Sequence, residues 1–263
     1  MVTGFVDARQ RLGQYSFTDS ELAAASPQSP VARRAALGRL HRLGRVVRPL
    51  PRHRFFVVVP HEHHSAGAPP LAWYLDALMR FLGVPDYYVG LLTAAQWHGA
   101  SHFAVQETQV VVPHQMRPIQ VGRERIRFVT KSAAAATPVV VRTAEGGTVR
   151  VSTPEATAAD LVRYADAAGG LNLVATVLAE LAPRLNPAAL TAAVAATPDQ
   201  AAAQRLGFIL DQVAGGRLTA PLARWLAAQH PRIRPLDAQA PVAGAAVDPR
   251  WRLRLNTIVE AGL

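Results

Sequence analysis

The sequence predicts an α+β protein in two parts, a small N-terminal module of helices with a β-hairpin and a larger C-terminal region of mixed α/β structure. The first 54 of the 263 residues contain ten arginines and only three acidic residues, so they supply +7 of the formal net charge of +10. A segment rich in Pro, Gly and His follows at 61–70, and beyond it helix and strand patterns alternate. We expect domains at 1–62 and 71–263, joined by a linker at 63–70.

Two helices with clear start signals are predicted in the basic segment. Residues 18–21 read T-x-x-E, the pattern of a capping box, so a short helix should follow and run to Ala25. Ser29-Pro30 predicts the N-cap and the first residue of a second helix. This helix should end before Gly44, because glycine readily adopts the left-handed conformation that closes a helix. Its apolar residues fall mostly on one face and its arginines mostly on the other.

A β-hairpin is predicted directly after the second helix. Residues 45–48 and 55–59 are rich in β-branched and aromatic residues, and the tip between them contains two prolines and Arg-His-Arg. Two helices followed by such a hairpin are typical of a winged helix-turn-helix module, whose second helix enters the major groove of DNA. The alternative is an ordinary small domain with a solvated basic face.

The winged-module interpretation predicts a set of DNA-contacting residues. They are Gln28, Ser29, Arg33, Arg34, Arg39, His41, Arg42, Arg45, Arg48, Arg52 and Arg54. Those nearest the start of the second helix, Gln28, Ser29 and Arg34, should lie closest to base edges, whereas Arg39 and Arg42 suit the phosphate backbone. Arg33 falls on the apolar side of the helix, where it should reach a phosphate or support packing.

Composition limits the other possibilities. The chain has no cysteine, which excludes disulfides and thiolate metal sites. It contains no apolar run of 18 residues and begins without the apolar core of a signal peptide, so we expect a cytoplasmic protein with no membrane contact. The histidine-rich stretch 61–64 lacks the i, i+4 histidine spacing of a zinc-binding helix. A solvated linker is expected there, and no metal or cofactor is predicted.

The C-terminal region is predicted to start with helices and strands and to end mainly helical. The expected helices cover 71–82, 91–97, 154–164, 171–181, 187–195, 200–212 and 221–229. The expected strands cover 109–112, 118–121, 126–130, 139–141, 148–151 and, as a returning strand, 251–255.

Five polar residues of the C-terminal region are the candidates for catalytic groups. They are His98, His102, Glu107, Glu155 and Asp160. Residues 152–155 read S-T-P-E, which predicts a second capping box that already uses the Ser152 hydroxyl and the Glu155 carboxylate. No glycine-rich phosphate loop of the G-x-x-x-x-G-K type is present. We therefore predict no catalytic residues and no enzyme activity.

Four collinear blocks resemble one protein family. Residues 87–102, YYVGLLTAAQWHGASH, resemble the signature of AbiE-type (AbiEi) antitoxins of bacterial abortive-infection systems. Three further blocks, at 151–162, 169–181 and 204–210, are similar to the same family and follow in the same order. The chain departs from the family in the hairpin, where members often carry a Gly-containing turn and this chain carries prolines and Arg-His-Arg.

This resemblance implies a two-domain antitoxin of a type IV toxin–antitoxin system. Its N-terminal domain would bind inverted repeats of double-stranded DNA in its own promoter and repress transcription. Its C-terminal domain would counteract a companion nucleotidyltransferase-like toxin without a stable complex. Because no heptad pattern or large apolar patch predicts a dimer interface, we expect a monomer in solution.

A ligand-responsive winged-helix repressor with a C-terminal sensor domain is the alternative function. Under this interpretation Tyr87, Tyr88, Trp97 and Phe103 would line an apolar ligand pocket. Such aromatic residues are more often part of the core.

Overall fold

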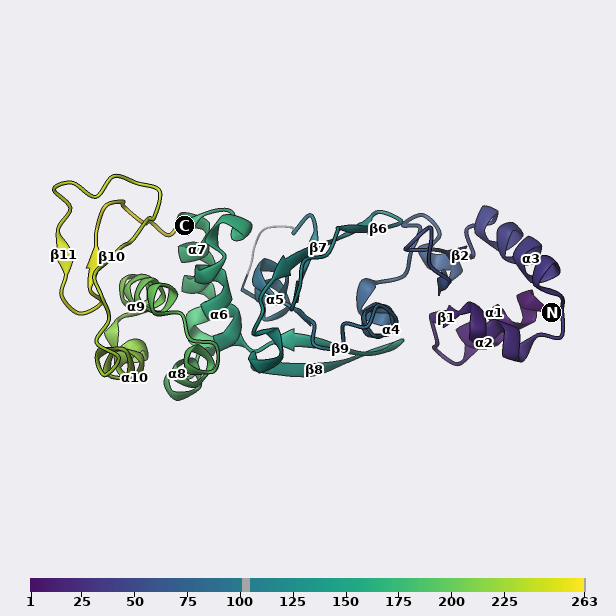
Figure 1. Cartoon of the computed structure of the whole chain (residues 1–263), viewed down its shortest axis with the longest axis horizontal. Helices are drawn as coiled ribbons and strands as arrows, with labels where there is room; N and C mark the ends of the chain where they lie inside the picture. Colours follow the sequence, from purple (N-terminus) through teal and green to yellow (C-terminus); the bar gives the residue numbers. More distant parts are fainter. Residues whose placement is uncertain (101–104, 263) are drawn as a thin grey trace. The chain divides into compact units, whose positions relative to one another are not determined.

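The chain forms two compact units in a computed structural model that describes residues 1–100 and 105–262. Unit 1 comprises Met1–Tyr88, Gln106–Ser132 and Val141–Arg150. Unit 2 comprises Val89–Val105, Ala133–Val140 and Val151–Leu263. Both α-helices and β-sheets are present (Figure 1), which confirms the predicted mixed fold class. The predicted boundaries at 62 and 70 stay a prediction.

Unit 1 begins with a module of three helices and a small sheet. Its elements are α1 (Val2–Arg11), β1 (Ser16–Thr18), α2 (Asp19–Ala25), α3 (Pro30–Arg42), β2 (Val46–Val47) and β3 (Phe55–Val58). The strands pair in the order β1-β3-β2, with both pairs antiparallel. This is the element order of a winged helix-turn-helix module. The two predicted helices and the hairpin are confirmed, whereas α1 and β1 were not predicted.

The starts of α2 and α3 carry side-chain caps, as predicted. The Thr18 hydroxyl accepts a hydrogen bond from the Glu21 backbone N–H at 3.3 Å, and Glu21 Oε2 accepts from the Thr18 N–H at 2.7 Å. The Ser29 hydroxyl accepts from the N–H of Ala32 at 3.3 Å, with Pro30 as the first helical residue. Gly44, at φ +69°, follows the end of α3 in the left-handed conformation.

A single apolar cluster holds the module together. Its buried members are Val2, Val6, Phe17, Leu22, Ala36, Leu37, Leu40, Val46, Phe56 and Val58. Phe17 occupies the centre, because its ring stacks on Phe56 at 5.1 Å and meets the edge of Phe5 at 5.3 Å. All three helices and all three strands therefore share one core.

The larger sheet has six strands in the order β6-β7-β5-β4-β9-β8. Its strands are β4 (Tyr88–Val89), β5 (Thr108–Val112), β6 (Ile119–Val121), β7 (Glu124–Thr130), β8 (Val139–Ala144) and β9 (Gly147–Ser152). β5 and β7 run parallel, and β6 and β7 form an antiparallel hairpin. The five strands predicted between 109 and 151 are confirmed with small shifts of their ends, and β4 was not predicted.

The helix predicted at 71–82 is interrupted. A 3-10 helix covers Leu71–Trp73 and α4 covers Leu75–Phe81. Tyr74 separates them, with φ −138° and ψ −3°, and its ring is buried. Packing of this aromatic side chain overrides the regular leucine spacing that predicted one continuous helix.

Within unit 1 the winged module is attached to the sheet region by specific contacts. The Tyr15 hydroxyl donates to Glu145 Oε1 at 2.7 Å, and the Tyr15 ring lies 4.5 Å from the ring of Trp73. Gly146 permits this approach, since a Cβ at that position would lie 2.0 Å from the Trp73 carbonyl oxygen. Burial and the hydrogen bond to Glu145 raise the pKa of Tyr15 to about 12.

Unit 2 is mainly helical. Its helices are α5 (Leu91–Trp97), α6 (Pro154–Arg163), α7 (Leu171–Leu181), α8 (Pro187–Ala196), α9 (Gln200–Ala214) and α10 (Gly216–Ala227). Helices α6 to α10 pack against one another (Figure 1). Three short strands, β10 (Arg234–Pro235), β11 (Val247–Asp248) and β12 (Leu253–Arg254), form a separate small sheet in the order β10-β12-β11. The predicted returning strand is β12 of this small sheet.

Two helix starts in unit 2 differ from prediction. α10 begins at Gly216 and contains Pro221 in its interior, so proline is not its first residue. The N-cap of α6 is Thr153, whose hydroxyl accepts from the Ala156 N–H at 3.2 Å, so the capping box predicted on Ser152 is wrong. In the described residues no helix meets the length and hydropathy needed to cross a membrane.

Candidate nucleic-acid interface

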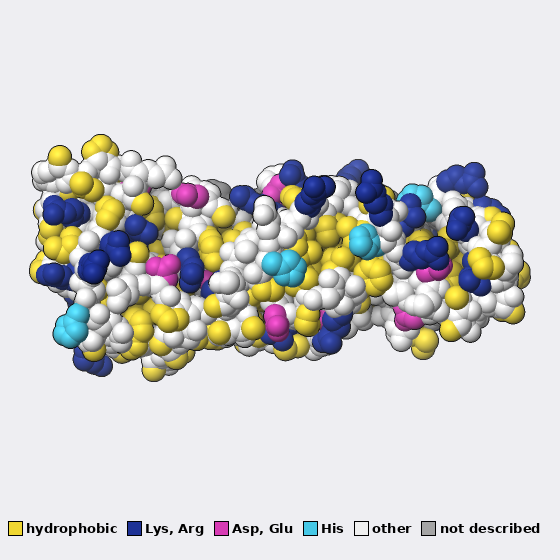
Figure 2. Space-filling view, viewed as in Figure 1, with side chains coloured by type: hydrophobic (Ala, Val, Ile, Leu, Met, Phe, Trp, Pro, Cys, Tyr) yellow, Lys and Arg dark blue, Asp and Glu magenta, His cyan; other side chains and the backbone are white. Residues whose placement is uncertain are grey.

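The predicted DNA-contacting residues lie on α3 and just before it, and on the hairpin formed by β2 and β3 with the residues that lead into it. Figure 2 shows Lys and Arg side chains gathered over this end of unit 1. The structure divides the predicted residues into three groups by the hydrogen bonds and ion pairs that their side chains make within the protein.

The first group maintains the start of α3. Gln28 Oε1 accepts from the backbone N–H of Val2 at 3.3 Å, and Ser29 is the N-cap of α3. Arg33 Nη1 donates to the Gln28 carbonyl at 2.6 Å, while its buried Nε has no hydrogen-bond partner among the described residues. In this position the Arg33 side chain contacts the segment that leads into α3. Contact of these three residues with DNA stays a prediction.

The second group has partners that leave part of each side chain available. Arg45 forms an ion pair with Asp7, and Arg54 pairs with Asp19 at 2.6 Å. His41 Nδ1 lies 3.0 Å from the Val46 carbonyl. Arg42 Nε donates to the Gly38 carbonyl at 3.4 Å. The acidic partners come from α1 and α2, so neighbouring carboxylates offset two of the predicted cations.

The third group consists of exposed arginines without such partners. Arg34 and Arg39 project from α3, and Arg48 and Arg52 belong to the hairpin. None of these four side chains makes a hydrogen bond or ion pair with another described residue. Because their charge is not offset locally, they dominate the positive potential of this face.

A hollow of about 190 Å³ separates α3 from β2. Its floor is apolar and includes Leu37, Val46 and Phe56, and Arg34 and Arg48 line it as well. Gly38 also lines the hollow, and a Cβ at this position would meet no atom within 4 Å. The lack of a side chain lets another molecule approach the helix backbone closely. The hollow therefore places an apolar floor beside the guanidinium groups of Arg34 and Arg48.

The hairpin tip is anchored despite lacking a glycine turn. Pro49 is buried, and the His53 N–H donates to the Leu50 carbonyl at 3.1 Å. The His53 ring meets the edge of Phe81 with ring centroids 6.2 Å apart. Arg52 and Arg54 remain exposed at the tip. The prolines and this turn thus hold the two arginines on an ordered support.

The candidate catalytic residues make structural contacts. His98 Nε2 lies 2.7 Å from the Ser152 carbonyl, and the Ser152 hydroxyl hydrogen-bonds with the Thr157 hydroxyl at 2.6 Å. Glu155 Oε1 accepts from the Asn186 N–H at 3.0 Å, which joins α6 to the start of α8. Glu107 pairs with Arg125 at 3.1 Å.

Of the remaining catalytic candidates and the aromatic residues predicted for a sensor pocket, some are buried and others lie outside the described residues. Asp160 is buried and has an interaction partner. Tyr87 and Tyr88 are fully buried and belong to the core, whereas His102 and Phe103 lie outside the described residues.

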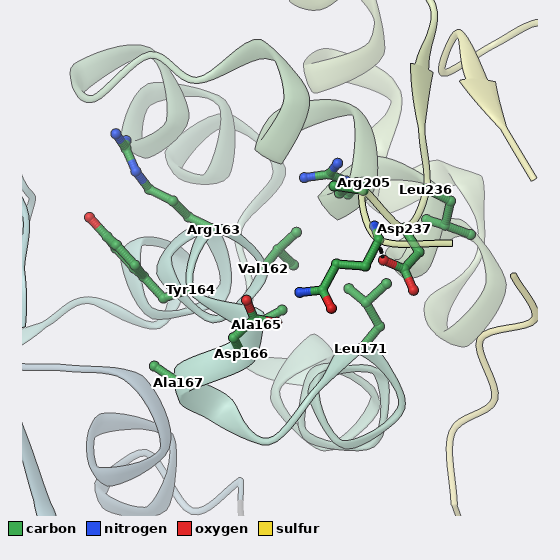
Figure 3. Close-up of a pocket in the computed structure, with 12 residues that line it drawn as sticks. Val162, Arg163, Tyr164, Ala165, Asp166, Ala167, Leu171, Arg205, Leu236 and Asp237 are labelled. Atoms are coloured by element: carbon green, nitrogen blue, oxygen red, sulfur yellow. Dashed lines mark hydrogen bonds between the residues drawn. The ribbon is translucent and has the colours of Figure 1, made fainter. Parts of the chain in front are cut away.

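Unit 2 has a groove of about 280 Å³ between α6, α7 and the segment that follows β10 (Figure 3). Arg205 and Asp237 lie on one side of it, and Leu171 lies below them (Figure 3). Arg205 donates to the Pro235 carbonyl from Nε and Nη2 at 3.3 and 3.1 Å. The side chains of Arg163 and Tyr164 extend together at the far end, with the guanidinium 5.7 Å from the ring centroid. The groove therefore presents charges of both signs around an apolar base.

The N-terminal module has the element order of a winged helix-turn-helix module and an exposed basic face, and it is joined to a mixed α/β region. Residues 88–212 match the family described as AbiEi antitoxin C-terminal domain. This match makes residues 88–212 similar to the antitoxin domain of a toxin–antitoxin, abortive-infection system, the family that the sequence blocks resemble.

A solved structure shares the fold over nearly the whole chain. It is the crystal structure of the RV2827C protein from Mycobacterium tuberculosis, with a TM-score of 0.64 and 16% sequence identity. The alignment covers 95% of this chain and 89% of that chain. No curated protein matches this chain.

Proposed function

We propose that the protein is a sequence-specific DNA-binding autorepressor and an antitoxin that counteracts a companion nucleotidyltransferase-like toxin. The observation that carries the DNA-binding half is the set of four exposed arginines, Arg34, Arg39, Arg48 and Arg52, on the outer side of the winged module. The target would be inverted repeats in the protein's own promoter. The AbiEi domain supports the antitoxin half.

In the proposed complex α3 lies in the major groove of double-stranded DNA. Arg34 lies five residues after the N-cap Ser29, beside the hollow that Gly38 leaves open, and this position suits bidentate contact with a guanine. Arg39 follows further along the helix and suits a phosphate. Arg48 and Arg52 extend from the hairpin to the adjacent backbone or minor groove.

Single substitutions separate base recognition from charge attraction. Arg34→Ala should weaken operator binding by about 1–3 kcal/mol and binding to a scrambled duplex by less, because a base contact is lost. Arg52→Ala should weaken both complexes equally and reduce the salt slope by about one, because one phosphate contact is lost. Fluorescence anisotropy across a salt series measures both effects.

Arg224→Ala provides a matched control, since Arg224 is an exposed arginine on α10 of unit 2. It should change neither affinity nor salt slope. Equal losses on both duplexes for Arg34→Ala would rule out its base-reading role.

The antitoxin half needs a separate test. With the full chain expressed from an unrelated promoter, Arg34→Ala should reduce operator preference and still protect cells from the companion toxin. Loss of protection in this correctly folded variant would contradict the proposed division between the winged module and the C-terminal region.

We propose that protection requires no enzyme activity and no stable complex, so toxin and antitoxin should elute separately as monomers. Co-elution of toxin and antitoxin would contradict the absence of a stable complex.

The groove of unit 2 is the observation that favours a second function, a ligand-responsive repressor. Its lining differs from the aromatic set predicted for a sensor pocket, because Tyr87 and Tyr88 are buried in the core. Under this alternative a small-molecule extract of the host cells would change the operator affinity of the protein. Asp166→Ala, in the groove lining, would remove that response. Operator affinity that is unaffected by the extract would favour the antitoxin function.

A further inference from the structure

The groove of unit 2 continues into a second depression of about 290 Å³. This depression lies between the start of α7 and the C-terminal segment at 257–259. The two spaces are continuous, because they share the lining residues Ala165, Asp166, Leu171, Asp237 and Gln239. Together they are named the trough below. Every residue that lines the trough belongs to unit 2.

The charged side chains of the trough do not neutralise one another. They are Arg163, Asp166, Arg205 and Asp237. Arg163 is engaged elsewhere, since its Nε lies 3.7 Å from Asp199 Oδ2. The other three side chains form no ion pair with a described residue. The trough therefore offers one positive and two negative charges, in a chain whose formal net charge is +10.

Arg205 and Asp237 are each held by neighbouring groups of the protein. Arg205 Nε and Nη2 both donate to the Pro235 carbonyl, at 3.3 and 3.1 Å, which leaves Nη1 for a ligand. Asp237 Oδ1 accepts from the Gln239 N–H at 2.8 Å, which leaves Oδ2. The Asn256 side chain fixes the backbone of Asp237 through hydrogen bonds of 3.1 and 2.8 Å. Two opposite charges are thus ordered in advance, and such preorganisation lowers the entropic cost of binding.

We propose that the trough binds a free basic amino acid such as lysine or arginine. The α-carboxylate pairs with Arg205 and the α-ammonium with Asp237, because these two side chains lie on one side of the trough (Figure 3). The aliphatic chain crosses Leu171, and the terminal cation of the ligand meets Asp166 on the other side (Figure 3). This inference deepens the ligand-responsive alternative, and it rests on that alternative only for an effect on DNA binding.

The charge and the size of the trough fit this class of molecule. A basic amino acid carries one negative and two positive groups, which complement the three available charges of the trough. A simple anion would be repelled by the two carboxylates, and a simple diamine would leave Arg205 unpaired. Drug-sized ligands occupy pockets of about 300–1,000 Å³, so spaces of about 280 and 290 Å³ suit a smaller metabolite. Leu171 and the buried Leu236 supply apolar contact for the chain of the ligand.

Isothermal titration calorimetry of the full chain tests the proposal. L-lysine and L-arginine should each show one saturable site per chain. L-norleucine lacks the side-chain amine of lysine, and cadaverine lacks its carboxylate. Each of these two analogues should bind about tenfold or more weakly than lysine, because each loses a hydrogen bond to a charged group. This comparison uses the unaltered protein and does not depend on the folding of a variant.

Substitutions assign each carboxylate to its amine. Asp166→Asn should weaken lysine binding about tenfold or more and leave norleucine binding unchanged, because norleucine has no group that reaches Asp166. Asp237→Asn should weaken the binding of both ligands. Asp86→Asn is the matched control, since Asp86 is an exposed aspartate of unit 1, and it should bind lysine normally. Circular dichroism melts should show all three variants folded.

The outcomes separate the site from its effect on DNA binding. The absence of saturable binding by both amino acids would overturn the inference, as would equal affinities for lysine, norleucine and cadaverine. An equal loss in Asp86→Asn would mean that net charge alone attracts the ligand, which would also overturn it. Binding of lysine without any change in operator affinity would instead refute the ligand-responsive alternative and leave the amino-acid site in place.

Discussion

The substitution Gly207→Ala tests the packing of unit 2 most sharply. Gly207 lies inside α9, and a Cβ there would stand 2.1, 2.2 and 2.4 Å from three carbons of the Trp251 ring. Carbon atoms normally approach to about 3.5–4.0 Å, so the ring must move by at least about 1 Å. Trp251 is only 1% exposed and has no space to move into.

The energetic cost follows from what holds this ring. Trp251 Nε1 donates to Asp211 Oδ2 at 2.8 Å, and its backbone N–H donates to Asp248 at 2.7 Å. Overpacking a core costs about 1–3 kcal/mol, and losing a hydrogen bond to a charged group costs about 1.5–3 kcal/mol. We expect Gly207→Ala to lower the free energy of unfolding by about 3 kcal/mol or more, although alanine favours helices.

Urea denaturation monitored by circular dichroism measures this change in the free energy of unfolding. Gly4→Ala is the control, because Gly4 lies in helix α1 and a Cβ at that position would meet no atom within 4 Å. This control should raise stability by about 0.5–1 kcal/mol. In a Trp251→Leu background the added methyl has room, so the two losses should not add. If Gly207→Ala were neutral or stabilising like Gly4→Ala, the packing of Trp251 on α9 would be refuted.

Three further substitutions probe unit 1. Thr18→Ala should cost about 1 kcal/mol in urea melts, because it removes the cap of α2, and an unchanged midpoint would contradict that role. Burial alone raises the pKa of Glu21, but hydrogen bonds from Thr18 and Arg9 outweigh it and the net pKa is lowered. Because the pKa of Glu21 is lower in the folded state, its carboxylate stabilises the fold above the pKa of the unfolded chain. That contribution is lost as the pH falls through the pKa of the folded state. Glu21→Gln should therefore destabilise the protein at about pH 7 and not in acid. Because the pKa of Tyr15 is raised to about 12, its contact with Glu145 should stabilise below about pH 10 and be lost towards about pH 12. Tyr15→Phe should remove that phenolate titration and cost about 1 kcal/mol, which ultraviolet absorbance and melts together can check.

The sequence predicted helices that begin with a side-chain cap. The helix and the cap that it missed have physical explanations. The caps at Thr18 and Ser29 depend on neighbours three residues away, so the sequence located both helices. Helix α1 was missed because only Val2 and Val6 of its ten residues are buried, and both pack on partners distant in sequence. The cap of α6 was assigned to Ser152, yet proline favours the first helical position, and Pro154 indicated Thr153 as the residue before it.

The sequence predicted which residues form the candidate interface. It did not predict which of their charges are neutralised by ion pairs within the protein. The arginine spacing on α3 predicted which side chains face outward. No local pattern indicated that Asp7 and Asp19 pair with Arg45 and Arg54, because these contacts span 38 and 35 residues.

The central proposal, operator recognition by the winged module, is tested most directly by fluorescence anisotropy of the unaltered protein on its own upstream DNA and on a scrambled duplex. The measurement should cover a series of salt concentrations, because charge attraction alone gives a steep salt slope on any duplex. Our proposal predicts clear preference for the upstream DNA at every salt concentration, together with a steep slope on both duplexes. Equal affinity for the two duplexes would contradict it and would leave the arginines of α3 and the wing as a solvated basic face.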